Sequence, residues 1–207
     1  GAIFGARPYP SSASKAAAEL IFDSYQNSFF ISKENFGAAS VRAGNVIGGG
    51  DFSADRIVPD CIRAFQKNQD VVLRNPLSTR PWQHVLEPLS GYMTLANQLI
   101  GKPQGSGAWN FGPDPENVRT VQELTELVIS ILGTGSIKIE QDKSQPLEAN
   151  LLMLNSDKAK TKLGWRPQWN FEEAVRNTVL WYQKVNQGDD PLAVTEQQLA
   201  TYLEAGK

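Results

Sequence analysis

The chain has 207 residues, of which 41% are hydrophobic and 20% are charged, and this average composition predicts a folded globular protein. Twenty basic and 22 acidic side chains give a formal net charge of -2. Because no cluster of Lys and Arg could follow a phosphate backbone, the sequence argues against nucleic-acid binding. No apolar run reaches the ~18 residues that a membrane span needs, so we expect no membrane segment.

Cysteine and histidine are each present once. A lone Cys61 cannot form an internal disulfide, and one Cys with one His cannot assemble a structural zinc site. We therefore expect no metal and a reducing, cytoplasmic location. The first residues lack the charged and apolar regions of a signal peptide, and helical periodicity begins almost at once. Such a start is typical of a fragment, so we expect truncation.

The first predicted element is a helix over residues 11–30, in which Ala17, Ile21 and Tyr25 recur at four-residue spacing. A short strand is predicted over 38–41, followed by a flexible, glycine-rich turn at 48–51. Further helices are predicted over 57–65, from Pro88 to Ile100, from a capping box at Thr120 to Leu132, around Lys158 and over 171–185. Further strands are predicted over 71–74, 83–86 and 109–111 and near Ile137 and Leu151.

This alternation of strands and helices predicts a mixed α/β fold. No internal repeat or low-complexity linker divides the chain. Four tryptophans are most simply explained as core or edge packing: Trp82, Trp109, Trp165 and Trp169. The sole histidine, His84, is interpreted as a structural residue at a strand end.

The start of the first helix resembles the active-site helix of the extended short-chain dehydrogenase/reductase family. Residues 11–20 read SSASKAAAEL, whereas the family uses Tyr-x-x-x-Lys. Residues four apart share a helix face, so such a lysine can sit near the cofactor ribose and lower the tyrosine pKa. A lysine after small residues is by itself more often a solvated surface residue. The motifs that follow favour the functional interpretation of Lys15.

Two longer strings resemble the signatures of CDP-glucose 4,6-dehydratases: RAGNVIGGGD at residues 42–51 and RPWQHVLEPLSGY at residues 80–92. Shorter matches lie at 56–60, 74–76, 109–113 and 163–167. The resemblance implies the C-terminal part of a Rossmann-type parallel sheet plus a smaller mixed α/β substrate-binding domain. Residues 1–207 would then form a single truncated unit, with both kinds of segment interleaved and the N-terminal cofactor-binding half absent.

The same resemblance assigns roles to single residues. Asn45 would donate hydrogen bonds to the substrate diphosphate, and Arg80 would grip it through its planar guanidinium. Without the surrounding motif, Arg80 would more simply be a surface ion-pair residue. The residues assigned to a nucleotide diphosphosugar such as CDP-glucose are Asn45, Arg56, Pro59, Arg74 and Arg80, and those assigned to NAD are Lys15 and Gly44.

The chain departs from the family pattern where the catalytic tyrosine is expected. A gapless alignment places Ser11 there, and using Tyr9 instead adds two residues before Lys15 and moves the phenol off the shared face. A serine hydroxyl is no usable base without a helper. The Gly-rich turn that seats NAD is missing as well, and Phe52 and Leu147 replace a Trp and a His. We therefore do not expect this chain alone to bind NAD or to convert substrate.

By resemblance, the intact reaction oxidises the C4 hydroxyl of CDP-glucose with NAD, eliminates water across C5 and C6, and returns the hydride to C6. This chain would be a fragment or a degenerate copy of such an enzyme. Two alternatives remain: a non-catalytic sugar-nucleotide-binding module, and an epimerase or reductase of the same architecture. The string at residues 80–92 argues against the second. The broad apolar surface of the helix at residues 11–30 predicts a homodimer or larger, less regular aggregates.

Overall fold

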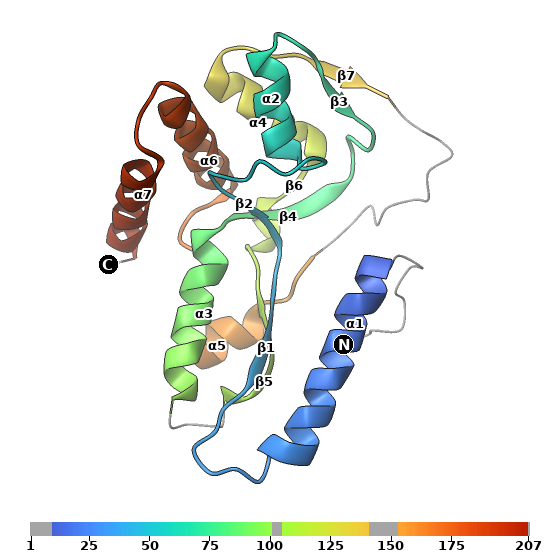
Figure 1. Cartoon of the computed structure of the whole chain (residues 1–207), viewed down its shortest axis with the longest axis vertical. Helices are drawn as coiled ribbons and strands as arrows, with labels where there is room; N and C mark the ends of the chain where they lie inside the picture. The colour runs from blue at the N-terminus through green and yellow to red at the C-terminus, as the bar shows by residue number, and fades with distance from the viewer. Residues whose placement is uncertain (1–9, 101–104, 141–152, 207) are drawn as a thin grey trace.

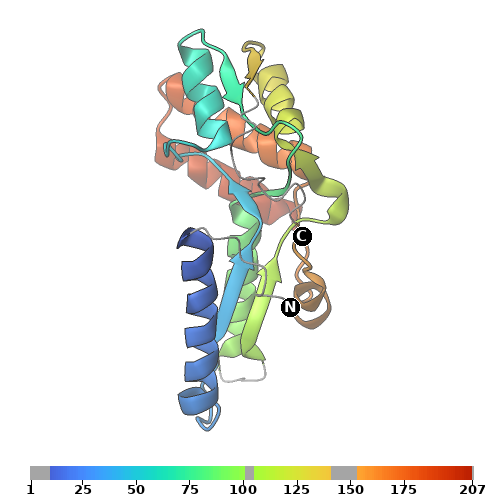
Figure 2. The ribbon, with the colours of Figure 1, turned by 90° about the vertical axis from the view of Figure 1, so that its right-hand side faces the viewer.

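The computed structural model describes residues 10–100, 105–140 and 153–206, with side chains from Ala13 onward. The molecule is elongated and consists of a lower and an upper part in the view of Figure 1; Figure 2 shows the same two parts stacked along the long axis. Segments of the two parts alternate along the sequence, as the order of colours in Figure 1 shows. The mixed α/β fold predicted from the sequence is confirmed.

The lower part is built on two parallel strands, β1 (Ala39–Ala43) and β5 (Gly107–Phe111). Helix α1 (Pro10–Tyr25) lies on one face of this sheet, while α3 (Leu86–Leu99) and α5 (Asp157–Leu163) lie on the other (Figures 1 and 2). Parallel strands covered by helices on both faces form the Rossmann-type arrangement.

Aromatic rings fill the core of the lower part. The fully buried Phe111 ring packs edge-on against Tyr92 and Trp165, at centroid distances of 5.5 and 5.1 Å. A Cβ on Gly91 would lie 2.2 Å from the Phe111 ring, so a glycine is needed for α3 to approach the sheet this closely. The Trp109 indole is also buried and donates a hydrogen bond to the Gly105 carbonyl at 2.7 Å.

The upper part contains two further sheets. In the larger one, β4 (Thr79–His84) lies between β2 (Asn45–Ile47), to which it is parallel, and β6 (Val118–Thr120), to which it is antiparallel. In the smaller one, β3 (Val71–Leu73) pairs in parallel with β7 (Ile137–Ile139).

Four helices complete the upper part: α2 (Ile57–Gln66), α4 (Val121–Leu132), α6 (Phe171–Asn186) and α7 (Pro191–Ala205). Helix α6 packs against α4 and β4 on one side and against α7 on the other. These helices share one core with the strands. Its most deeply buried side chains are Val58, Cys61, Leu73, Leu124, Val128, Ala174, Val175, Val179 and Tyr182.

The capping box predicted at Thr120 is confirmed. The Thr120 hydroxyl accepts a hydrogen bond from the Glu123 amide at 3.0 Å, and the Glu123 carboxylate accepts one from the Thr120 amide at 2.7 Å. The helix ends at Gly133, which has a left-handed backbone with φ 71° that favours glycine. Asn170 and Glu173 form an equivalent box at the start of α6.

Several predicted boundaries are wrong. The strand expected over 83–86 is β4, which ends at His84, and α3 begins at Leu86. Pro88 therefore sits inside the first helical turn, where backbone amides have no helical partner and a proline is tolerated. By contrast, the helix expected over 11–30 has the predicted extent, because α1 ends at Tyr25 and continues as a π-helix, Gln26–Phe30.

Other elements were not predicted at all, namely β2, β6, α7 and the 3-10 helix Pro115–Asn117. The strand expected near Leu151 lies outside the described residues. In the described portion of the chain, none of the helices has the length and apolar character that crossing a membrane demands.

Candidate functional site

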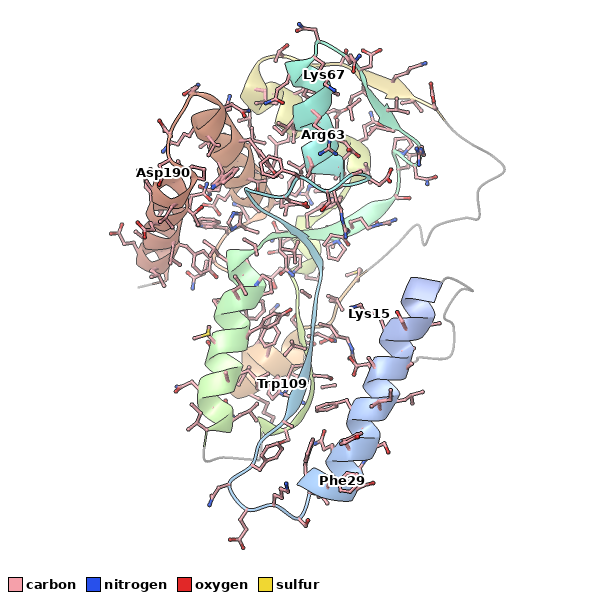
Figure 3. All side chains as sticks on the ribbon, viewed as in Figure 1. Lys15, Phe29, Arg63, Lys67, Trp109 and Asp190 are labelled. Carbon is pink, nitrogen blue, oxygen red and sulfur yellow. The ribbon has the colours of Figure 1, made fainter. Side chains whose placement is uncertain are left out.

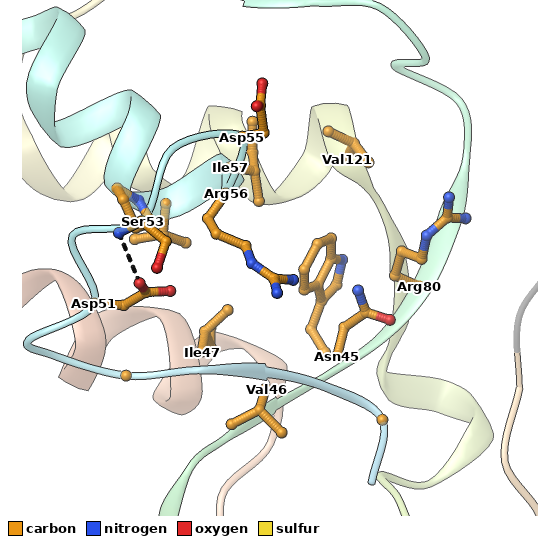
Figure 4. A pocket seen from close by; sticks show the side chains of 15 residues that line it. Asn45, Val46, Ile47, Asp51, Ser53, Asp55, Arg56, Ile57, Arg80 and Val121 are labelled. Atoms are coloured by element: carbon orange, nitrogen blue, oxygen red, sulfur yellow. Dashed lines mark hydrogen bonds between the residues drawn. The ribbon is translucent and has the colours of Figure 1, made fainter. Parts of the chain in front are cut away.

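A cavity of about 550 Å³ opens in the upper part, beside the point where β1 gives way to β2 (Figure 4). Its lining comes from three separate stretches of sequence: residues 44–59, strand β4 and the start of α4. Five of the residues predicted to bind ligands line it together: Gly44, Asn45, Arg56, Pro59 and Arg80. The fold thus brings together groups that are up to 36 positions apart in sequence.

Gly44 allows Asn45 to reach this cavity. A Cβ on Gly44 would lie 2.5 Å from the Pro81 carbonyl oxygen, so a glycine is required where the chain passes over β4. The next residue, Asn45, opens β2 opposite Trp82. The Trp82 indole donates a hydrogen bond to the Arg119 carbonyl at 3.1 Å, which fixes this nearly buried ring in the cavity wall.

Two arginines line the cavity on either side of Asn45. Arg56 immediately precedes α2 with an extended backbone, and Figure 4 shows its side chain reaching across the cavity toward Asn45. Arg80 lies on the other side of Asn45, where its guanidinium extends away from the amide and donates to the Thr79 carbonyl at 2.8 Å. Two arginine side chains and a neutral amide at one cavity offer many hydrogen-bond donors, which is the chemistry that recognises a diphosphate.

The opposite end of the cavity carries acidic groups. The Ser53 amide donates to the Asp51 carboxylate at 2.9 Å, and this hydrogen bond lowers the pKa of Asp51, with help from the charges of Arg56 and Arg63. Asp55 lines the same cavity. A negatively charged ligand is therefore favoured at the end where Asn45 and Arg80 lie, not at the Asp51 end.

Two of the assigned nucleotide-binding residues differ from the others in position. Arg74 does not line this cavity but an adjoining hollow of about 510 Å³, which shares Asp55, Ile57 and Val121 with it. Pro59 is a buried wall residue in the first turn of α2. The structure thus places Asn45, Arg56 and Arg80 at one cavity and Arg74 in the adjoining hollow.

Lys15 lies in the lower part, toward the end of α1 that is nearer the upper part (Figure 3). One helical turn further on, the partly buried Glu19 carboxylate accepts hydrogen bonds from Arg42 Nε at 2.9 Å and from the Ser40 hydroxyl at 2.9 Å. This pairing docks α1 onto β1. The side chain of Ser11 and all of Tyr9 lie outside the described residues, so the catalytic assignment of Lys15 and Ser11 remains a prediction.

NAD fits this chain only in part. The parallel strands of the lower part are of the Rossmann type, but the 207 residues contain no Gly-x-Gly-x-x-Gly turn. The turn at Gly48 to Gly50 packs on the Trp181 ring, since a Cβ on Gly49 would lie 2.1 Å from that ring. We therefore derive no chemical step through NAD. Among the described residues, no group of three or more His, Cys, Asp or Glu could hold a metal ion.

Several residues that line the cavity were not predicted from the sequence. Asp51 and Trp82 stand inside the two matched strings, so those strings contained a signal, although Trp82 was interpreted only as packing. Ser53 and Asp55 carry no comparable signal, because a serine and an aspartate in a polar loop are ordinary surface residues.

The fold and the cavity define the class of this protein: a Rossmann-type α/β protein whose second part holds a cavity lined by Asn45, Arg56 and Arg80. The chain belongs to the family described as GDP-mannose 4,6 dehydratase, whose family model matches residues 5–178.

Relatives with curated names are sugar-nucleotide enzymes. The CDP-glucose 4,6-dehydratase of Salmonella typhimurium is 41% identical over 201 residues, which cover 95% of this chain and 56% of that protein. The human dTDP-D-glucose 4,6-dehydratase is 26% identical over 181 residues, or 84% of this chain and 48% of that protein. The chain thus spans about half the length of these relatives. The resemblance to CDP-glucose 4,6-dehydratases noted in the sequence is confirmed.

Solved structures agree on the fold. The dTDP-glucose 4,6-dehydratase of Bacillus anthracis, in complex with NAD, superposes with a TM-score of 0.74 at 24% identity, covering 90% of this chain and 56% of that one. A dTDP-glucose 4,6-dehydratase of Streptomyces venezuelae, with NAD bound, gives a TM-score of 0.70 at 21% identity, covering 88% and 53%. At these identities the likeness supports the architecture alone.

Proposed function

We propose that this chain is the substrate-holding part of a sugar-nucleotide 4,6-dehydratase that converts CDP-glucose to CDP-4-keto-6-deoxyglucose with NAD. The observation that carries the proposal is the arrangement of Arg56, Asn45 and Arg80 around one cavity. The name of the 41% identical Salmonella relative supports CDP-glucose as the substrate.

The residues of this chain hold and orient the nucleotide diphosphosugar. Arg56 and Arg80 neutralise the diphosphate from two sides, and the Asn45 amide donates to it without adding charge. The nearly buried Trp82 ring gives the cavity a rigid wall beside the diphosphate. NAD supplies the hydride chemistry in the intact reaction, and Lys15 and Gly44 are proposed to lie beside it.

We further propose that residues 1–207 act as one unit in a cytoplasmic homodimer. The support for the dimer is the surface of α1, where Leu20, Ile21 and Tyr25 are each more than half exposed. Such a cluster of apolar side chains is typical of an interaction surface.

A second candidate is a sugar-nucleotide-binding module that lacks catalysis. Ser11 favours it, because this residue stands where the family has its tyrosine and has no phenolic group to act as a base. The two candidates share the cavity and differ only in product formation.

Calorimetric titration of the chain with CDP-glucose tests the shared claim. Arg56→Ala and Arg80→Ala should each weaken binding by about tenfold or more, since a hydrogen bond to a charged group is worth ~1.5–3 kcal/mol. Arg176→Ala is the matched control, because this exposed arginine on α6 does not line the cavity. Unchanged affinity in both cavity variants would refute the diphosphate assignment. A 4-keto product formed in the presence of NAD would exclude the non-catalytic candidate.

A further inference from the structure

One wall of the cavity is a short loop, residues 48–53, which contributes Gly48, Asp51 and Ser53 to the lining. The sequence predicts that its glycines make it flexible. In the structure, by contrast, helices α2 and α6 hold the loop from two sides through side chains that do not themselves line the cavity.

Tyr182 on α6 makes the first of these attachments. Its hydroxyl donates a hydrogen bond to the Asp51 carbonyl at 2.5 Å and lies 3.5 Å from the Gly48 carbonyl. The Phe52 ring meets the Tyr182 ring edge-on, with 6.0 Å between centroids. Burial and the Asp51 charge raise the pKa of Tyr182 to about 12, so the phenol keeps its proton and remains a donor at neutral pH.

Trp181, the preceding residue, fixes the glycine turn by contact. Its ring occupies the space that a side chain on Gly49 would need, and it lies 3.6 Å from the Cβ position of Gly50, whose φ is +79°. The Trp181 indole in turn donates a hydrogen bond to the Thr195 hydroxyl on α7 at 2.9 Å. The last two helices of the chain are thereby connected to the cavity wall.

Arg63 on α2 holds the other end of the loop. Its guanidinium donates to the Phe52 carbonyl at 3.1 Å and to the Ser53 carbonyl at 3.0 Å, and it forms an ion pair with Asp60. Arg63 and Tyr182 together bind the carbonyls of three successive loop residues, 51–53. A loop bound in this way has little freedom to change shape when a ligand enters.

We infer that Trp181 and Tyr182 are positioning residues that hold the 48–53 loop in its ligand-binding shape before the ligand arrives. The inference extends the proposed function, on which it depends for the identity of the ligand. Both residues lie beyond the stretch that the family model matches, residues 5–178. If the loop already has its ligand-binding shape, no conformational entropy is lost in ordering it when the ligand binds. If only a fraction of the molecules has that shape, the observed affinity is lowered in proportion to the fraction.

The test compares Tyr182→Phe with Tyr202→Phe, using CDP as the probe and the 207-residue chain as the protein. Both variants remove one hydrogen-bonded phenol, but the Tyr202 hydroxyl donates to the Glu87 carboxylate at 2.9 Å, away from the cavity lining. Tyr182→Phe should weaken CDP binding about two- to tenfold, the effect of one hydrogen bond. Tyr202→Phe should lower the melting temperature and leave the CDP affinity unchanged.

Rate constants separate positioning from general destabilisation. If the loop must find its shape before binding, Tyr182→Phe lowers the association rate constant of CDP and leaves the dissociation rate constant within about twofold. Interface substitutions ordinarily act on dissociation instead. An unchanged association rate constant, or an equal loss of affinity in Tyr202→Phe, would overturn the inference.

Amide hydrogen exchange tests the same inference without a ligand. Residues 48–53 should exchange faster in Tyr182→Phe than in the unsubstituted chain, and Thr195→Val should give a smaller acceleration because it removes only the partner of the Trp181 indole. Thr195 is exposed, so that variant keeps the fold if Tyr182→Phe does not. If the chain does not bind CDP but residues 48–53 exchange faster in Tyr182→Phe, the proposed function is refuted and the positioning role stands. If exchange at residues 48–53 is unchanged in both variants, the positioning role is refuted.

Discussion

Acidification should destabilise this protein through its sole histidine. His84 ends β4 and is 2% exposed, with its ring packed edge-on against Trp169 at a centroid distance of 4.8 Å. Its Nδ1 accepts a hydrogen bond from the Leu86 amide at 3.3 Å, which places the ring proton on Nε2. Within the described residues, Nε2 has no hydrogen-bond partner. The folded chain therefore favours the neutral imidazole, because the described residues provide no hydrogen-bond acceptor for Nε2 of the protonated ring.

The size of the effect follows from the pKa of His84. Burial lowers this pKa from its usual 6.5 to about 4, so between these values the unfolded chain binds a proton that the folded chain does not. The contribution of His84 is complete above about pH 7 and is lost as the pH falls toward 4. At about 1.4 kcal/mol per pH unit, the loss amounts to about 3 kcal/mol, a large part of the free energy of unfolding of a typical domain.

Proton NMR can follow this group directly, because the ring protons of a single histidine give one unambiguous signal. The folded chain should show no titration between pH 7 and pH 5, whereas the urea-unfolded chain should titrate near 6.5. Urea unfolding measured at pH 7, 6 and 5 should show a falling free energy of unfolding over the same interval.

His84→Asn is the control, since its amide oxygen can accept from the Leu86 amide but cannot be protonated in this range. The variant should lose part of its stability at pH 7 and show a flatter dependence between pH 7 and pH 5. The carboxylates of the chain contribute the same pH dependence of the free energy of unfolding in both proteins, so the difference between the two slopes reports His84. A folded-state histidine signal that titrates near 6.5, or equal slopes in both proteins, would refute the reasoning.

Two further predictions concern single contacts. Cys61 is fully buried, and burial raises the pKa of its thiol to about 12. A thiol reagent should therefore leave Cys61 unlabelled in the folded chain and label it rapidly in urea. Fast labelling of the folded chain would contradict this prediction. Arg42→Met should loosen α1 from β1, seen as faster amide exchange in α1 with a loss of about 0.5–1 kcal/mol, because the pair with Glu19 is partly exposed. Unaltered exchange in α1 would show that the Arg42–Glu19 pair does not dock this helix.

Asn45 and Arg80 belong to different matched strings, and the fold brings both to one cavity. Their roles in binding stay predictions, while several element boundaries can be compared with the structure directly. The boundary between β4 and α3 was wrong because hydrophobic periodicity cannot locate a strand end within a few residues. Pro81 pairs opposite Val118 in the antiparallel register of β4, although a proline within a run argues against a strand.

The residues that hold the 48–53 loop in place could not be predicted from the sequence. Tyr182 and Trp181 read as apolar residues of an amphipathic helix, and nothing in their spacing indicates that a loop about 130 residues earlier will contact them. Glu87 is similar: it stands in a matched string, but its partners are the amides of Gln168 and Trp169 and the Tyr202 hydroxyl. Such contacts are set by tertiary packing, which local pattern does not encode.

The short path from Arg42 to Asn45 connects the helix proposed for catalysis to the cavity proposed for substrate binding. Arg42 binds Glu19, one helical turn beyond Lys15, while Asn45 opens the strand that carries the cavity. Between them, Gly44 passes so close to β4 that no larger residue fits without movement of the backbone. The helix proposed for catalysis and the cavity proposed for binding are held in register by one stretch of backbone.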